Sequence, residues 1–293
     1  MPIAILGPTA SGKSAVAVAV AHRIGGTVVN GDPYQAIQGL AIGTGQPDEA
    51  GQDGVPHVGY GILPLSARPN PMAFGALVRE WLSFSCEPVL VTGSGLYLRG
   101  IWNQLSDLPK VAPALVDRVR RWGAQLGTPV LHRFLAAVDS TRASALSPHD
   151  SARVLRALAL HLATGGAPSD LLSGAERGIP EGWQVLVVSP SREHRRDRVV
   201  ARVAAQVRTG WLEEVAQLLA TGHAGDLVAL RPLGYAAWVT GGDPGAVQAA
   251  VAQETQAYAK RQATWFRNQL PQAPVWDPDA ESLAAAFLRL GLR

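Results

Sequence analysis

Cysteine, lysine and long apolar runs are scarce in this chain of 293 residues. The single cysteine, Cys86, leaves no partner for an intramolecular disulfide and excludes a cysteine-rich zinc site. No apolar run approaches the length that a helix needs to cross a bilayer, and the first apolar segment follows neither a charged leader nor a cleavage site. We therefore expect a cytoplasmic protein without a signal peptide and without a membrane-spanning helix.

Charged residues are also few. They make up 17% of the chain, against 47% hydrophobic residues, which is typical of a globular protein rather than a disordered one. The net charge is +3, and only three of the 26 basic residues are lysines: Lys13, Lys110 and Lys260. This mild basic bias is compatible with a polyanionic partner, although genome composition explains the excess of arginine equally well.

Lys13 lies in a phosphate-loop motif that follows the first apolar run. Residues 2–6 are apolar and residues 15–21 are small, which predicts a strand before the motif and a helix after it. Because lysine is so scarce, an ordinary glycine turn is a poor explanation of a lysine in the required position. The motif has the pattern GxxxxGK[ST] and consists of Gly7, Pro8, Thr9, Ala10, Ser11, Gly12, Lys13 and Ser14.

The residue types of this motif suit the phosphates of a ligand. The two glycines let the backbone turn so that several N–H groups point at one anion, and the following helix adds the partial positive charge of its N-terminus. Lys13 brings a full charge to the outer phosphate, and the hydroxyl group of Ser14 is suited to binding Mg²⁺. We therefore expect a phosphate and magnesium site at the start of this helix.

Two further apolar segments, 27–30 and 88–92, are predicted to be buried strands of the same sheet. The first is followed by Asp32, and the second by a Gly-Ser-Gly sequence centred on Ser94. Because ligands of open α/β sheets bind at the carboxyl ends of the strands, both residues are expected beside the phosphate loop. Asp32 is either a functional carboxylate at this edge or a turn residue that caps the chain before Pro33, and the pattern alone favours neither.

The strand at 88–92 ends in Thr92, where a P-loop NTPase usually has the aspartate that holds Mg²⁺. The loop can thus hold a diphosphate without serving ATP hydrolysis. An alternative function is a P-loop small-molecule or nucleotide kinase, with ATP in the loop and Asp32 as the base for a substrate hydroxyl. Another is a nucleotide-gated RNA-binding protein without chemistry. Thr92 argues against the kinase, and Asp32 at the sheet edge argues against the protein without chemistry.

Residues 105–180 differ from the rest of the chain in their sequence pattern, which is that of short helices separated by turns. We predict an α/β fold in which residues 1–104 and 181–293 form a P-loop NTPase-like core with a parallel sheet, and residues 105–180 form a small inserted helical domain. The helical patterns of this insertion are separated by turns that contain glycine or proline, and they cover residues 115–126, 130–138 and 151–163.

Arginines gather on two of the predicted helical faces. In the insertion, Arg153 and Arg156 are three residues apart and share a face, which is either a binding surface or a solvated basic face. In the most basic segment of the chain, Arg195, Arg198 and Arg202 share a face that suits a phosphate-rich ligand. Glu193 and Asp197 in the same segment also allow a self-paired surface helix, so both interpretations stay open.

A long helix is predicted at 248–269, near the end of the chain. Lys260 and Arg267 share one face of it, and Tyr258 and Trp265 share another. Bases with aromatic neighbours suit an RNA backbone and its stacked bases. The apolar members of this helix are equally compatible with a place in the protein core.

The motifs in their order along the chain resemble those of bacterial tRNA dimethylallyltransferases, the IPP transferase family. A phosphate loop alone is unspecific, whereas six motifs in the family's order, spread over almost the whole chain, are a specific match. The six are residues 7–14, Asp32-Pro33-Tyr34-Gln35 with 39–47 beyond it, Gly93-Ser94-Gly95-Leu96-Tyr97, residues 153–158, Arg231-Pro232-Leu233-Gly234-Tyr235, and residues 259–267.

This resemblance implies transfer of a dimethylallyl group from dimethylallyl diphosphate to N6 of adenosine 37, next to the anticodon of tRNA, with Mg²⁺ and release of diphosphate. By position, Asp32 would be the general base, Ser94 would help position the reacting groups, and residues 7–14 with Arg202 would bind diphosphate, with Ser14 on the metal. A monomer is expected. The residues implied to contact the anticodon stem-loop are Asp32, Pro33, Tyr34, Gln35, Ser94, Arg153, Arg156, Arg231, Gly234, Tyr235, Lys260, Arg261 and Arg267.

Five positions depart from the family's pattern. Ser94 replaces the usual threonine and keeps its hydroxyl group. Gln46 stands where lysine is common, and Gly61 stands where aspartate is usual. Val116 and Ala236 stand where arginines are frequent. The two missing arginines bear on the strength of RNA binding and not on the class of reaction.

Overall fold

The chain divides into two compact units, each with its own core. One unit combines Met1–Asn103 with Arg177–Arg293, and the other is Gln104–Glu176. The sequence pattern places these boundaries after residues 104 and 180. Among the described residues, no helix combines the length and the apolar character that crossing a membrane requires. The computed structural model describes residues 1–106, 108–172 and 178–292.

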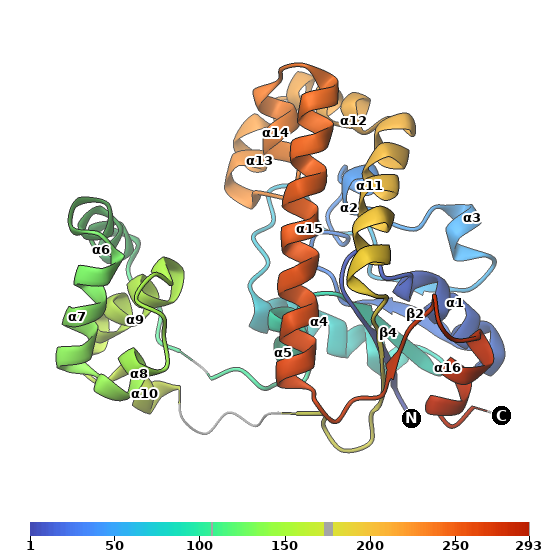
Figure 1. Ribbon diagram of the computed structural model, residues 1–293, viewed down its shortest axis with the longest axis horizontal. Coiled ribbons are helices and arrows are strands. Elements are labelled where there is room, and N and C mark those ends of the chain that lie inside the picture. The colour runs from blue at the N-terminus through green and yellow to red at the C-terminus, as the bar shows by residue number, and fades with distance from the viewer. Residues whose placement is uncertain (107, 173–177, 293) are drawn as a thin grey trace. The chain divides into compact units, whose positions relative to one another are not determined.

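A parallel β-sheet lies at the centre of the larger unit (Figure 1). In the described part of the chain it has six strands in the order β3-β2-β4-β1-β5-β6, and every neighbouring pair is parallel. The apolar runs at residues 2–6, 27–30 and 88–92 all form strands of this sheet, which confirms the predicted α/β core. The strands are β1 (Ile3–Leu6), β2 (Thr27–Asn30), β3 (His57–Val58), β4 (Pro88–Thr92), β5 (Gln184–Val188) and β6 (Val275–Trp276).

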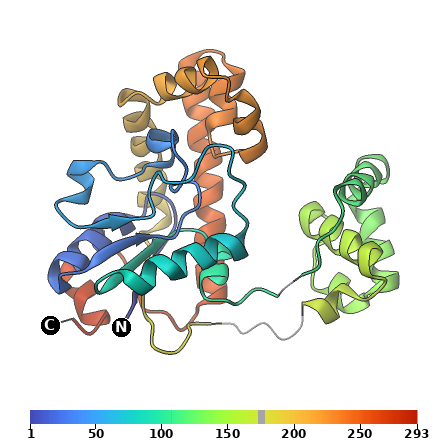
Figure 2. The same cartoon turned by 180° about the vertical axis from the view of Figure 1, so that it is seen from behind.

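Helices cover both faces of the sheet (Figures 1 and 2), so the strands are buried on both sides and are apolar almost throughout. In β1, Ile5 belongs to the core on one face and Leu6 to the core on the other. The helices of the first face are α1 (Lys13–Ile24) and α16 (Leu283–Arg289). Those of the second are α4 (Pro71–Phe84), α5 (Gly95–Ile101) and the C-terminal part of α15 (Pro244–Gln269).

A third apolar cluster is built by helices that follow β5. Helix α11 begins directly after that strand and lies along α15 (Figure 1). Trp211 and Tyr235 are buried at the centre of the cluster with their rings in edge contact, 5.5 Å between centroids. The short helix α2 contacts α12 in this part of the molecule, and α3 follows it in the chain. The elements are α11 (Arg192–Arg208), α12 (Trp211–Ala220), α13 (Ala224–Leu230), α14 (Tyr235–Thr240), α2 (Ala41–Thr44) and α3 (Glu49–Gln52).

Helix α15 begins one turn earlier than the predicted 248–269, at Pro244. The carboxylate of Asp243 accepts a hydrogen bond from the backbone N–H of Ala246 at 2.8 Å and so caps the helix. Pro244 then fits the first helical position, where its missing N–H group has no cost. The predicted end at Gln269 is confirmed.

The smaller unit is entirely helical in its described part. Its core is formed by Val119, Leu131, Leu135 and Val154, which lie on three different helices. Asp139 caps α8 by accepting the N–H of Arg142 at 2.8 Å. The helices are α6 (Pro113–Leu126), α7 (Thr128–Val138), α8 (Ser140–Ser144), α9 (Ser151–Thr164) and α10 (Pro168–Leu171).

Candidate active site

The phosphate loop joins β1 to α1 with a strained backbone. Gly12 has a φ angle of 90°, and Ala10 has a φ angle of 62°, a left-handed conformation that is costly for a residue with a side chain. A Cβ atom at Gly7 would lie 2.4 Å from the carbonyl oxygen of Val188, so a larger residue would not fit. The loop therefore passes close to the end of β5 in the way that the glycine spacing predicts for a loop around an anion.

Three charged side chains, Lys13, Asp32 and Arg202, lie close enough to shift one another's pKa values. Burial, followed by repulsion from Arg202, lowers the pKa of Lys13 to about 8, against the attraction of Asp32. Burial raises the pKa of the Asp32 carboxyl, and the N–H of Tyr34 and the charge of Lys13 oppose that rise. Burial also lowers the pKa of Arg202, opposed by Asp32. Two cations beside one carboxylate leave an excess of positive charge, which suits an anionic ligand.

The carboxylate of Asp32 is held by a short network at the end of β2. The amide oxygen of Asn30 accepts the Asp32 N–H at 2.8 Å, and the amide nitrogen donates to the Asp32 carbonyl at 2.9 Å. Oδ1 of Asp32 accepts the N–H of Tyr34 at 3.0 Å. Asp32 caps a turn and also lines a cavity, so its geometry is compatible with both alternatives considered from the sequence.

This cavity has a volume of about 310 Å³ and brings residues from several elements around Asp32. Arg202 and Thr9 line it from α11 and the phosphate loop, and Tyr258 lines it from α15. Its wall therefore combines charged side chains with aromatic ones. The complete lining consists of Thr9, Asp32, Tyr34, Gly43, Thr44, Tyr97, Arg202, Gln206, Trp211, Arg231, Leu233, Thr255 and Tyr258.

The tyrosines of the cavity stay protonated. Burial, followed by the charge of nearby Tyr34 and Asp32, raises the pKa of Tyr97 to about 12. Burial and the charge of Asp32 also raise the pKa values of Tyr34 and Tyr258. The hydroxyl of Tyr34 donates to the carbonyl of Leu230 at 3.1 Å, which fixes its ring. These rings can therefore offer flat apolar surface to a ligand without adding charge.

The segment that carries Gly43 and Thr44 is fixed from α11 and α12. Arg202 donates to the carbonyl of Thr44 at 3.0 Å, and the amide of Gln206 donates to the carbonyl of Gly43 at 3.0 Å. The carboxylate of Glu214 accepts the N–H of Gly43 at 3.2 Å. This side of the cavity is therefore preorganised by hydrogen bonds between segments far apart in the chain.

Three residues expected to contact RNA are buried. Tyr235 is 0% exposed, and its hydroxyl donates to the carboxylate of Glu214. A Cβ atom at Gly234 would lie 2.6 Å from the ring of Trp211. Pro33 is buried behind Asp32. Direct contact of these three residues with RNA stays a prediction, and in the free protein Gly234 and Tyr235 pack against Trp211, which lines the Asp32 cavity.

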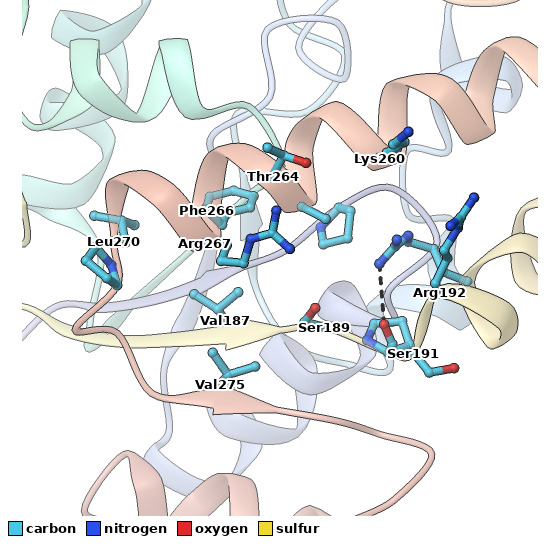
Figure 3. Close-up of a pocket in the computed structure, with 15 residues that line it drawn as sticks. Val187, Ser189, Ser191, Arg192, Lys260, Thr264, Phe266, Arg267, Leu270 and Val275 are labelled. Atoms are coloured by element: carbon cyan, nitrogen blue, oxygen red, sulfur yellow. Dashed lines mark hydrogen bonds between the residues drawn. The ribbon is translucent and has the colours of Figure 1, made fainter.

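The other expected RNA contacts of the larger unit lie in different places. Arg231 lines the Asp32 cavity. The guanidinium of Arg261 lies over the ring of Tyr258, with its Cζ atom 5.7 Å from the centroid. Lys260 and Arg267, by contrast, line a second cavity of about 590 Å³ on another side of α15 (Figure 3).

Gln35 and Ser94 have mainly structural contacts. The amide of Gln35 donates to the carbonyls of Thr44 and Gly45 at 3.0 and 2.8 Å. Ser94 follows β4 as predicted and precedes α5, with its N–H donated to the hydroxyl oxygen of Thr92 at 3.1 Å. Among the described residues that line the Asp32 cavity, Ser94 is absent.

Three expected site residues are exposed at helix surfaces. Ser14 lies in the first turn of α1, next to the phosphate loop. Arg153 and Arg156 lie on α9 of the smaller unit, and Arg153 is 3.5 Å from the carboxylate of Asp150. Each is therefore accessible to a ligand in solution.

Gln262 is a site residue that the sequence pattern does not reveal. Its side chain is 6% exposed, and its Oε1 atom accepts the N–H of Thr9 in the phosphate loop at 2.8 Å. It also interacts with the hydroxyl of Tyr258, which lines the Asp32 cavity. Helix α15 and the phosphate loop are therefore tied together by one buried amide.

We expect Gln262→Met to weaken binding of inorganic diphosphate about tenfold, because a buried N–H without an acceptor costs about 1–3 kcal/mol and the loop would relax. Titration calorimetry at fixed pH measures this affinity. Gln248→Met, on the first turns of the same helix, is the matched control and should bind as the unchanged protein does. Equal affinities for both variants would show that the Thr9 contact does not shape the loop.

Family models and proteins of known name match this chain over most of its length. A family model described as IPP transferase matches residues 35–269, and one described as isopentenyl transferase matches residues 2–58. The tRNA dimethylallyltransferase of Rhodospirillum centenum is 38% identical over 94% of this chain and 92% of that protein. The tRNA dimethylallyltransferase of Mesorhizobium japonicum is 39% identical over 94% of this chain and 88% of that protein.

Solved structures show the same fold. The tRNA isopentenylpyrophosphate transferase of Bacillus halodurans aligns with a TM-score of 0.68 and 26% identity, over 99% of this chain and 96% of that one. A eukaryotic dimethylallyltransferase acting on tRNA aligns with a TM-score of 0.76 and 20% identity, over 97% of this chain and 77% of that one. The second likeness, at this low identity, concerns the fold alone.

Proposed function

Since the chain belongs to the IPP transferase family, we propose that it transfers a dimethylallyl group from dimethylallyl diphosphate to N6 of adenosine 37 in the anticodon loop of tRNA. The proposal rests on one observation: Asp32 lies close to Lys13 and Arg202 beside one cavity. A carboxylate base next to a diphosphate site is what alkylation of an amine by a prenyl diphosphate requires. We propose that one chain suffices, because all three side chains come from it.

The phosphate loop would hold the diphosphate. Its backbone N–H groups, the N-terminus of α1 and the charges of Lys13 and Arg202 would stabilise the negative charge that develops as the diphosphate leaves. No group of three or more His, Cys, Asp or Glu side chains suited to a metal occurs in the described part of the chain. The exposed hydroxyl of Ser14 would hold Mg²⁺, and bound Mg²⁺ would supply positive charge to the leaving diphosphate.

Asp32 would act as the general base. The bond between N6 and the first prenyl carbon forms as the bond from that carbon to diphosphate breaks, and the N6 proton passes to the Asp32 carboxylate. Burial raises the pKa of this carboxyl, which makes the ionised form a stronger base. The turn formed with Tyr34 keeps the carboxylate in place before the substrate binds.

The target adenine would bind in the cavity lined by Tyr34, Tyr97 and Tyr258. The base cannot reach this edge of the sheet while it is stacked in the anticodon loop, so it has to be turned out. Tyrosine rings at fixed angles can stack on a base whatever its sequence context. We propose that the exposed arginines of the smaller unit, Arg153 and Arg156, contact the stem of the same tRNA.

An assay with tRNA, Mg²⁺ and either labelled dimethylallyl diphosphate or labelled ATP tests the proposal. Transfer of the prenyl label to RNA supports it. Transfer of phosphate from ATP would support the kinase alternative, which the end of β4 at Thr92 instead of an aspartate already disfavours. Binding of RNA without transfer of either label would indicate an RNA-binding protein that has no catalytic activity.

RNA binding should be electrostatic in both units. We expect Arg153→Ala and Lys260→Ala each to weaken tRNA binding and to lower the slope of log affinity against log salt by about one unit, as a lost phosphate contact does. Fluorescence anisotropy at several salt concentrations measures both quantities. Arg120→Ala, on α6 and paired with Asp117, is a control of equal charge change. If the slopes were unchanged in both variants, we would conclude that these side chains belong to the solvated surface and do not contact RNA.

A further inference from the structure

A basic groove runs between α11 and α15, apart from the Asp32 cavity. It consists of two adjoining cavities of about 590 and 330 Å³ that share Arg192, Arg195 and Lys260. Arg267 lies in the first cavity and Arg196 in the second. Figure 3 shows Lys260 and Arg267 projecting from α15, and Arg192 beside Ser191 at the start of α11.

The five cations of this groove have no acidic partner in the described part of the chain. Among the residues that the structure describes, none of Arg192, Arg195, Arg196, Lys260 and Arg267 forms an ion pair, whereas Arg198 on the same helix is paired with an aspartate. Burial and the like charge of Arg192 lower the pKa of Arg195, which remains a cation at neutral pH. Like charges gathered in one groove repel one another, so a bound polyanion would stabilise them.

The groove is too long for a small anion. Its residues on α15 extend from Gln253 to Leu270, which at about 1.5 Å per residue is roughly 25 Å. A nucleic acid presents one phosphate about every 3.4 Å along each strand of a duplex, so several consecutive phosphates fit this length. Toward the end of the groove, Val275 provides exposed apolar surface for a ribose or a base, beside the buried Val187 and Phe266 (Figure 3).

We infer that this groove binds a stretch of tRNA sugar–phosphate backbone away from the target nucleotide. The inference rests on the proposed function, and it adds Arg192, Arg195 and Arg196 of α11 to the RNA-binding surface. The side of α15 with Tyr258 and Gln262 faces the Asp32 cavity and the phosphate loop, while the side with Lys260 and Arg267 faces the groove. Helix α15 thus separates the site of chemistry from a second place of attachment for the same RNA.

The test is equilibrium binding of tRNA, without prenyl diphosphate, to Arg192→Ala/Arg195→Ala protein. We expect affinity to fall on the order of tenfold at low salt and the salt slope to fall by about 1.8 units, since phosphate contacts to a duplex contribute about 0.9 each. Arg208→Ala, an exposed arginine at the end of α11 outside the groove, is the matched control and should bind tRNA as the unchanged protein does. The doubly substituted Arg192→Lys/Arg195→Lys protein keeps the charge and should retain most of the affinity, which excludes misfolding as the cause.

Two outcomes would overturn the inference. One is tRNA affinity and salt slope in the double alanine variant equal to those of Arg208→Ala. The other is that the groove binds a small anion instead of RNA. Calorimetry on Lys13→Ala protein would then show binding of inorganic diphosphate. The two arginine substitutions would abolish that binding and leave tRNA affinity unchanged. Because both measurements need no prenyl transfer, failure of the groove is distinguishable from failure of the proposed activity.

Discussion

Replacement of Asp32 by asparagine is expected to lower the single-turnover rate of prenyl transfer by about 10²–10⁴-fold, the usual contribution of a positioned general base. The amide has the same shape and can still accept the N–H of Tyr34, so the turn at the end of β2 should survive. It can orient the adenine amine, but it cannot take the proton. We therefore expect tRNA and prenyl diphosphate affinities to stay within a few-fold.

The rate and the melting temperature have to be measured on the same Asp32→Asn sample. Asp139 provides a matched control, because it is a buried aspartate that caps helices, accepting the N–H groups of Arg142 and Ser169 at 2.8 and 2.7 Å. Asp139→Asn should lower the melting temperature and leave the rate of the folded protein unchanged. If Asp32→Asn behaved in the same way, its role would be that of a turn residue and the general-base assignment would be wrong.

Replacement of Lys13 by alanine is expected to reduce transfer by roughly two or more orders of magnitude, because a preorganised donor at developing charge typically contributes that much. The melting temperature should not fall. Burial lowers the pKa of Lys13 to about 8, which means that keeping the charged side chain in the folded protein costs free energy. The alanine variant does not have this cost. Lys110→Ala removes an exposed lysine and serves as the control for diphosphate binding. Near-native turnover of Lys13→Ala at saturating substrate would refute the assignment of the loop.

The pKa of Lys13 also predicts how diphosphate affinity depends on pH. Below pH 8 the side chain is charged in the free protein, and above it the charge is progressively lost. Bound diphosphate favours the charged form, so binding above pH 8 should take up a proton and weaken as pH rises. Calorimetry between pH 7 and 10 in two buffers of different ionisation enthalpy measures this proton uptake. The uptake should disappear in Lys13→Ala.

Structural features that depend on residues close together in the sequence are predictable from this sequence. The strands at 27–30 and 88–92 are apolar runs with the observed bounds, because a strand covered on both faces has no polar side to interrupt the pattern. The phosphate loop is recognisable because its backbone geometry requires glycine at two fixed positions. The two-residue strands β3 and β6 are too short to carry any periodic signal.

Features that depend on distant partners are not predictable in this way. Gln262 binds the phosphate loop across 253 residues of sequence, and nothing in its own segment indicates that contact. Tyr235 lies in a motif that suggests an RNA contact, yet its burial results from packing against Trp211 and from the carboxylate of Glu214. Likewise, the sequence pattern puts Lys260 and Arg267 on one face of a helix but does not show that α11 completes a groove with them.

The contact between Thr9 and Gln262 has a consequence for biosynthesis. A ribosome that adds about 5–20 residues per second needs about 13–50 s to make the 253 residues between the two partners. Throughout that time the nascent chain carries a phosphate loop whose Thr9 N–H lacks its acceptor, and β1 lacks its neighbour β5 until residue 188 has been made. A product terminated before residue 262 therefore contains the complete phosphate-loop motif but lacks the amide that holds the loop to α15.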